Sequence, residues 1–148
     1  HGVKPGRLKP ELTESLLLDN IEDVVAKMQA LRRMGVRFAL DDFGTGYSSL
    51  AYLKRFPFEQ LKIDRSFVRA IGDGSQAASD EGVIAQAIIS LGHALHLKVI
   101  AEGVETERQV SFLRRHGCDE VQGFFYGEPQ APEGYAKVLE HAMKRKRR

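Results

Sequence analysis

The fold of this chain is decided by the stretch Val36-Arg37-Phe38-Ala39-Leu40-Asp41-Asp42-Phe43-Gly44-Thr45-Gly46. An apolar strand ends in two adjacent carboxylates, Asp41 and Asp42, and a glycine-rich turn follows at once. Two like charges side by side in a partly buried site stay ionised only when a cation neutralises them. Carboxylate oxygens suit Mg²⁺ or Mn²⁺. Taken alone, the pair is equally well explained as exposed loop residues, one of which caps the next helix.

Polar residues also follow the other apolar strands of the sequence, in the places where those strands end. They are Glu11, Glu14, Lys62, Glu102, Glu105 and Gln122. Each of these strands precedes a helix-like segment. Polar side chains gathered at the carboxyl ends of successive parallel strands form the active site of a βα barrel.

The pattern of apolar residues predicts five strand-then-helix units, which indicate an α/β fold with a parallel sheet. The predicted strands are 8–14, 36–42, 59–64, 98–102 and 119–122, and the helices are 20–34, 48–55, 79–96, 105–116 and 133–145. A closed βα barrel has eight units. We therefore expect five units of a TIM-like (βα)8 barrel, incomplete at its N-terminus, within a longer domain. The alternative is a self-sufficient open α/β sheet.

The composition is that of an ordinary globular protein, with 43% hydrophobic and 28% charged residues in a chain of 148. The formal net charge of +2 predicts no duplex nucleic acid partner, although residues 144–148 form a basic tail. Cys118 is the only cysteine, so an internal disulfide is excluded and a reducing cytoplasmic location is expected. No apolar run approaches the roughly 20 residues of a membrane span.

Five motifs in order resemble the C-terminal portion of the EAL domain, the family of bacterial cyclic di-GMP phosphodiesterases. They are Glu11-Leu12-Thr13-Glu14, Asp41-Asp42-Phe43-Gly44-Thr45-Gly46, Leu61-Lys62-Ile63-Asp64, Ala101-Glu102-Gly103-Val104-Glu105 and Gln122-Gly123-Phe124. The resemblance runs from Gly2 to about Tyr135, and the whole chain, 1–148, is interpreted as the C-terminal portion of such a domain.

Some features depart from the family pattern. The Glu-Ala/Val-Leu signature and an Asn ligand are not in this chain, and they would precede His1. Pro10 interrupts the first predicted strand, where a backbone N–H is expected. Glu128 stands in Gly127-Glu128-Pro129 where the family often has a basic residue.

The resemblance implies a site with two Mg²⁺ or Mn²⁺ ions. Asp41 would bridge the metals, Asp42 and Glu11 would each ligate one, and Glu102 would ligate or act as general base. Lys62 would orient the attacking water, and Gln122 would hold a water or a phosphate oxygen. Glu14 and Glu105 are expected to anchor loops or support the ligands. Taken singly, Glu102 is better explained as an acid near a helix N-terminus, and Lys62 as a salt-bridge partner or a surface lysine.

The implied activity is hydrolysis of cyclic di-GMP to the linear dinucleotide pGpG. A non-catalytic receptor with the same fold is the alternative. The resemblance also implies a homodimer and fused sensory or GGDEF-like domains elsewhere in the protein. We expect the 148-residue chain on its own to be inactive.

Overall fold

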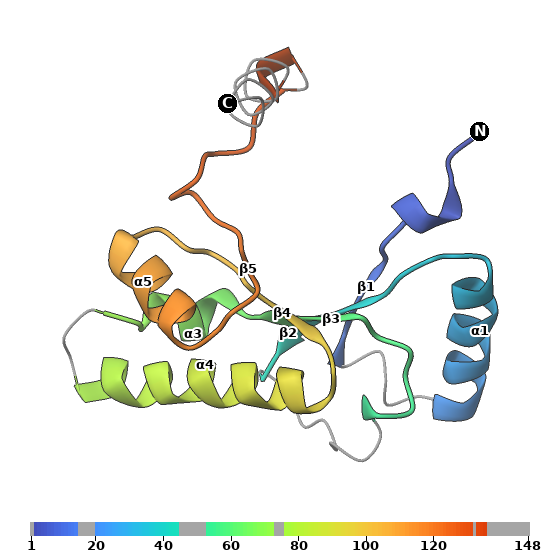
Figure 1. The fold of residues 1–148 in the computed structure, drawn as a ribbon, viewed down its shortest axis with the longest axis horizontal. Coiled ribbons are helices and arrows are strands. Elements are labelled where there is room, and N and C mark those ends of the chain that lie inside the picture. Colours follow the sequence, from blue (N-terminus) through green and yellow to red (C-terminus); the bar gives the residue numbers. More distant parts are fainter. Residues whose placement is uncertain (1, 15–19, 45–52, 73–75, 132, 136–148) are drawn as a thin grey trace.

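A computed structural model shows a parallel sheet of five strands in the order β1-β2-β3-β4-β5 (Figure 1). It describes residues 2–14, 20–44, 53–72, 76–131 and 133–135, without the side chains of 76–81. The strands are β1 (Glu11–Thr13), β2 (Ala39–Phe43), β3 (Gln60–Ile63), β4 (Lys98–Ala101) and β5 (Glu120–Val121). Strands therefore neighbour one another in chain order, as consecutive βα units require.

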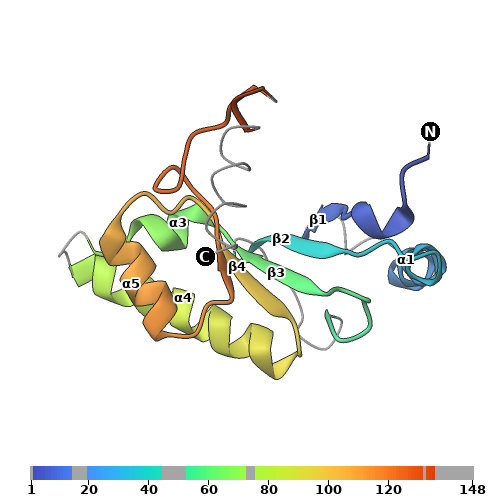
Figure 2. The same cartoon turned by 45° about the horizontal axis from the view of Figure 1, so that its top comes forward.

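Helices connect the strands of the sheet. They are α1 (Ile21–Arg33), α3 (Arg65–Arg69), α4 (Gln76–Ala94) and α5 (Glu107–Arg115), and a 3-10 turn, η1 (Pro5–Arg7), precedes β1. Figures 1 and 2 show α3, α4 and α5 on the same side of the sheet, with α1 beyond β1. The segment after β5 leaves the sheet on the opposite side. No described helix is both long and apolar enough to cross a membrane.

The register of the strands separates an apolar row from a polar row. Leu40, Leu61 and Val99 are aligned across three strands, and all three side chains are completely buried. Because side chains alternate along a strand, the residues next to them, Asp41 and Lys62, belong to the other face. Burying each large aliphatic side chain stabilises the fold by about 1.5–3 kcal/mol. The apolar row thus holds the sheet on its helices and leaves the polar row for the site.

The helix α4 packs on β3 and β4 at short distance. Gly92 permits this approach, since a Cβ there would lie 2.4 Å from Cγ2 of Val99. The buried cluster continues from this contact through Ile89 and Val68.

Both fully described outer helices end where the sequence predicts. Gly35 follows α1 with φ +97°, and Gly117 follows α5 with φ +81°, a conformation that glycine adopts at little cost. The N–H of Val36 donates to the carbonyl of Leu31 at 3.1 Å, and that of Cys118 donates to Leu113 at 2.9 Å.

The five predicted strands are confirmed, but several boundaries are wrong. The first strand begins at Glu11 rather than residue 8, because Pro10 has no N–H and offers only its carbonyl, which accepts from Ala39. The helix α4 begins at Gln76, earlier than the predicted 79. The short helix α3 was not predicted at all. The predicted helices 48–55 and 133–145, and the basic tail 144–148, lie wholly or mostly outside the described residues.

Candidate metal and active site

A bulge in β2 places both aspartates of the Asp-Asp pair near the same edge of the sheet. Leu40 is aligned with Leu61 and Phe43 with Ile63, so β2 has one residue more than β3 between these two alignments. In a regular strand, adjacent side chains point to opposite faces. The extra residue removes that alternation, and Asp42 adopts φ +52° to accommodate it. Among residues other than glycine, Asp and Asn tolerate this conformation best.

The Asp42 carboxyl lies among other acids. Burial raises the pKa of Asp42 above its ordinary value, and the charges of Asp41 and Asp64 raise it further. A bound divalent cation would reverse this effect, because an adjacent positive charge favours the ionised carboxylate.

Lys62 holds the carboxylates together. Its side chain is only 7% exposed, and Nζ lies 2.6 Å from Glu11, 3.0 Å from Asp41 and 2.6 Å from Glu102. Burial alone would lower the pKa of Lys62, but hydrogen bonds to Glu102, Glu11 and Asp41 outweigh it and hold the pKa well above its ordinary value. The ammonium therefore stays charged and contacts acids from β1, from β2 and from the residue that follows β4.

Three of these acids form a group that fits a metal ion. Asp41, Asp42 and Glu102 each offer a carboxylate oxygen, and these oxygens lie within 4.8 Å of one another. All three residues are partly buried, so water solvates their charges only in part. A bound cation would compensate for this loss of solvation. An all-oxygen donor set is the one that hard divalent cations prefer. Glu11 reaches the same group through its contact with Lys62.

Glu102 and Gln122 follow neighbouring strands. The N–H of Glu102 donates to Ile63 at 3.2 Å, which extends the β3–β4 ladder to the site. The N–H of Gln122 donates to Ala101 at 2.9 Å, and its carbonyl accepts from Val104 at 3.0 Å. Gln122 is thus fixed beside the segment that follows Glu102, although its side chain is exposed.

Glu14 and Glu105 are not among the three acids that fit a metal ion. Glu14 is buried, at 5% exposure, one residue after the end of β1. The loop that Glu14 is expected to anchor, Phe43–Leu50, falls mostly outside the described residues. Glu105 is exposed and lies 3.6 Å from Arg69 on α3, so it contacts the neighbouring βα connection.

Asp64 lies beside the site, although the sequence did not predict it as a site residue. Its carboxylate accepts hydrogen bonds from the backbone N–H of Ser66 at 2.9 Å and from the Ser66 hydroxyl at 2.5 Å, so it caps α3. Burial acts to raise the pKa of Asp64, but these hydrogen bonds lower it below its ordinary value. In the sequence, Asp64 follows Leu61-Lys62-Ile63 and precedes Ser66 by two residues. This position was the available signal that Asp64 caps a helix.

The family and the relatives that match this chain agree with one another. Residues 1–129 match the EAL domain family. The cyclic di-GMP phosphodiesterase NbdA of Pseudomonas aeruginosa is 49% identical over 122 residues, which cover 82% of this chain and 15% of NbdA. The bifunctional diguanylate cyclase/cyclic di-GMP phosphodiesterase MucR of the same species is 46% identical, over 90% of this chain and 19% of MucR. The chain thus spans less than a fifth of the length of these relatives.

Solved structures agree with the fold. The PaMucR phosphodiesterase in its c-di-GMP complex superposes with a TM-score of 0.83 at 45% identity, covering 91% of this chain and 53% of that one. A manganese and cyclic di-GMP complex of Klebsiella pneumoniae BlrP1 superposes with a TM-score of 0.73 at 31% identity, covering 86% and 32%. The five units therefore correspond to part of a TIM-type barrel.

Proposed function

The chain belongs to the EAL domain family, and from that membership we propose that it forms part of a phosphodiesterase that hydrolyses cyclic di-GMP to pGpG. The observation that carries the proposal is the Lys62 ammonium, which lies within 3.0 Å of acids from β1, β2 and the end of β4. Two of these acids, Asp41 and Glu102, lie toward the carboxyl ends of their strands, which is where βα barrels carry out chemistry.

The residues present fit a pair of divalent cations, and we propose Mg²⁺ or Mn²⁺. Asp41, Asp42, Glu11 and Glu102 would supply the carboxylate oxygens that hold them. When bound, such ions would neutralise phosphate charge and make an attacking water more nucleophilic. Klebsiella pneumoniae BlrP1 has also been solved as a calcium and cyclic di-GMP complex.

The chain's own residues supply positioning and proton transfer. The Lys62 ammonium keeps Glu11, Asp41 and Glu102 in place and balances their charge before substrate arrives. Glu102 has a carboxylate within reach of this centre and would accept the proton of the attacking water. Gln122, whose backbone is bound to the Glu102 loop, would donate its amide N–H to a phosphate oxygen.

A receptor that binds cyclic di-GMP without cleaving it is the second candidate. A receptor has no need of the acids or the lysine, yet Glu11, Asp41, Asp42, Glu102 and Lys62 are all present. Their joint presence favours the enzyme. We further propose that the protein acts as a homodimer in the cytoplasm and is fused to sensory or GGDEF-like domains, as the length of the relatives suggests.

Product analysis separates the two candidates. The protein, in the longest form that can be expressed, is incubated with cyclic di-GMP and Mn²⁺, and nucleotides are resolved by chromatography. We expect pGpG to accumulate with Mn²⁺ and to stop when a chelator is added. Cyclic di-GMP that binds and is recovered intact would make the protein a receptor, and no binding would refute both candidates.

A further inference from the structure

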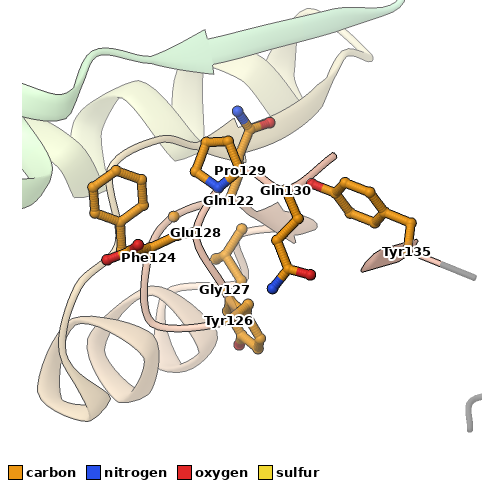
Figure 3. A pocket seen from close by; sticks show the side chains of 10 residues that line it. Gln122, Phe124, Tyr126, Gly127, Glu128, Pro129, Gln130 and Tyr135 are labelled. Atoms are coloured by element: carbon orange, nitrogen blue, oxygen red, sulfur yellow. The ribbon is translucent and has the colours of Figure 1, made fainter. Parts of the chain in front are cut away.

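A hollow of about 450 Å³ opens at the edge of the sheet where β3, β4 and β5 begin. Its volume is within the range of about 300–1,000 Å³ that small-molecule sites occupy. The first residues of these strands, Gln60, Lys98 and Glu120, contribute to its lining. A different hollow follows β5 and contains Gln122 (Figure 3), so it belongs with the candidate site. The hollow at the amino ends of the strands is not used by the proposed chemistry.

Gln60 provides a buried polar group in this lining. The residue is only 7% exposed, and its Oε1 accepts a hydrogen bond from Nζ of Lys9. Its amide nitrogen donates to no group within the described residues, and no fully buried side-chain N or O atom there lacks a partner. The nitrogen must therefore be accessible from the hollow, where it presents N–H donors to a ligand.

Both acids of the lining are already paired with cations. Nε of Arg37 lies 4.0 Å from Glu59, and Nζ of Lys98 lies 4.0 Å from Glu120. The four side chains are between 40% and 68% exposed, so water screens both pairs. The two acids thus balance two of the cations and leave no negative charge to compensate the others.

The other two permanent cations of the lining have no acidic partner. Lys9 contacts the neutral amide of Gln60, and Arg32, in the last turn of α1, makes no ion pair within the described part of the chain. A guanidinium offers a planar fork of donors that matches phosphate oxygens, and an ammonium adds a compact charge. The hollow therefore combines an excess of positive charge with a buried neutral donor.

We propose that this hollow binds the phosphate groups of a small phosphorylated molecule, at a second site separate from the carboxylates. The ammonium of Lys9, the guanidinium of Arg32 and the amide of Gln60 would donate to the phosphate oxygens. Phosphate suits these donors better than a carboxylate, because each group carries more charge and more acceptor atoms. Gln60 lies two residues before Lys62 on the same face of β3, so the two sites occupy opposite ends of one strand.

Calorimetry with pyrophosphate tests the proposal. Chelator is present throughout, so that no metal at the carboxylates can hold the probe, and ionic strength is fixed. We expect the protein to bind pyrophosphate at least about tenfold more tightly than succinate, which offers only carboxylates. Arg32→Gln should weaken pyrophosphate binding roughly tenfold, as loss of a charge-assisted hydrogen bond predicts. Arg33→Gln, at the adjacent exposed arginine that does not line the hollow, should leave it unchanged.

Side-chain amide resonances of the wild-type protein give a readout that needs no variant. Pyrophosphate should shift the Gln60 amide signals and leave those of Gln122 in place, because Gln122 follows β5 at the other end of the sheet. Equal weakening by Arg32→Gln and Arg33→Gln, succinate binding as tight as pyrophosphate, or a shift at Gln122 alone would overturn the proposal. Arg32→Gln should hydrolyse cyclic di-GMP at the wild-type rate, so failure here leaves the proposed function untouched.

Discussion

Replacing Lys62 with methionine removes the cation that joins three acids while keeping most of the length of the side chain. The Lys62 side chain is 7% exposed, and its Nζ contacts Glu11, Asp41 and Glu102 at 2.6–3.0 Å. Breaking a buried ion pair costs about 3–5 kcal/mol because the remaining charges are left uncompensated. The Glu11 side chain is 44% exposed and water screens it, so we expect the lower end, about 3 kcal/mol. In a protein of this size that lowers Tm by roughly 6–12 °C.

Divalent cations should reverse much of this loss. In Lys62→Met the acids repel one another without compensation, so Mg²⁺ should bind more tightly and stabilise the variant more than the wild type. Urea unfolding followed by circular dichroism, with chelator and with Mg²⁺, measures both effects. Lys98→Met is the control, since Lys98 is 68% exposed and lies 4.0 Å from Glu120, and it should change stability by less than about 0.5 kcal/mol. Equal losses for Lys62→Met with and without Mg²⁺ would refute the reasoning.

Three further changes test other parts of the account. Asp41→Asn should lower kcat for cyclic di-GMP by at least roughly a thousandfold, equivalent to about 4 kcal/mol, and leave Tm nearly unchanged; turnover close to wild type would refute the bridging role. Gly123→Ala should lower Tm strongly, because its Cβ would clash with Val104, whereas Gly82→Ala should be neutral or stabilising. Burial opposes the lowered pKa of Asp119, and hydrogen bonds from Val99 and His93 outweigh it. A lowered folded-state pKa stabilises above the unfolded pKa of about 3.9, so Asp119→Asn should destabilise at neutral pH and match the wild type in strong acid.

The βα order and the site edge could be predicted because they depend on local patterns. The apolar run 36–40 before Asp41 and Asp42 predicts a strand that ends in acids, and glycines at 35 and 117 predict helix ends that the structure confirms. Parallel strands then bring their carboxyl ends to one edge, so the meeting of Asp41 and Glu102 follows from topology. Glu11 is the first residue of β1 and joins them through its contact with Lys62.

The details that were missed depend on contacts between distant segments. The bulge at Asp41 and Asp42 exists only relative to β3, and no periodicity within β2 reveals it. Asp64 was passed over because its neighbours predicted a strand end, whereas the structure uses it to cap α3 beside Asp42. The close approach of Gly123 to Val104 likewise depends on how β5 packs beside β4.

The roles of individual acids remain predictions that solution chemistry must test. Glu14 is buried as a supporting residue would be, but the loop it is expected to anchor lies largely outside the described residues. Glu105 contacts Arg69 rather than the acids, which accords with a role in fixing a loop.

The central claim is tested most directly by anomalous diffraction from crystals of the protein grown with Mn²⁺ and cyclic di-GMP. The account predicts two manganese peaks about 3.5–4 Å apart, with Asp41 between them and Asp42, Glu11 and Glu102 around them. Manganese bound elsewhere, or none at these carboxylates in a protein that still hydrolyses cyclic di-GMP, would contradict it.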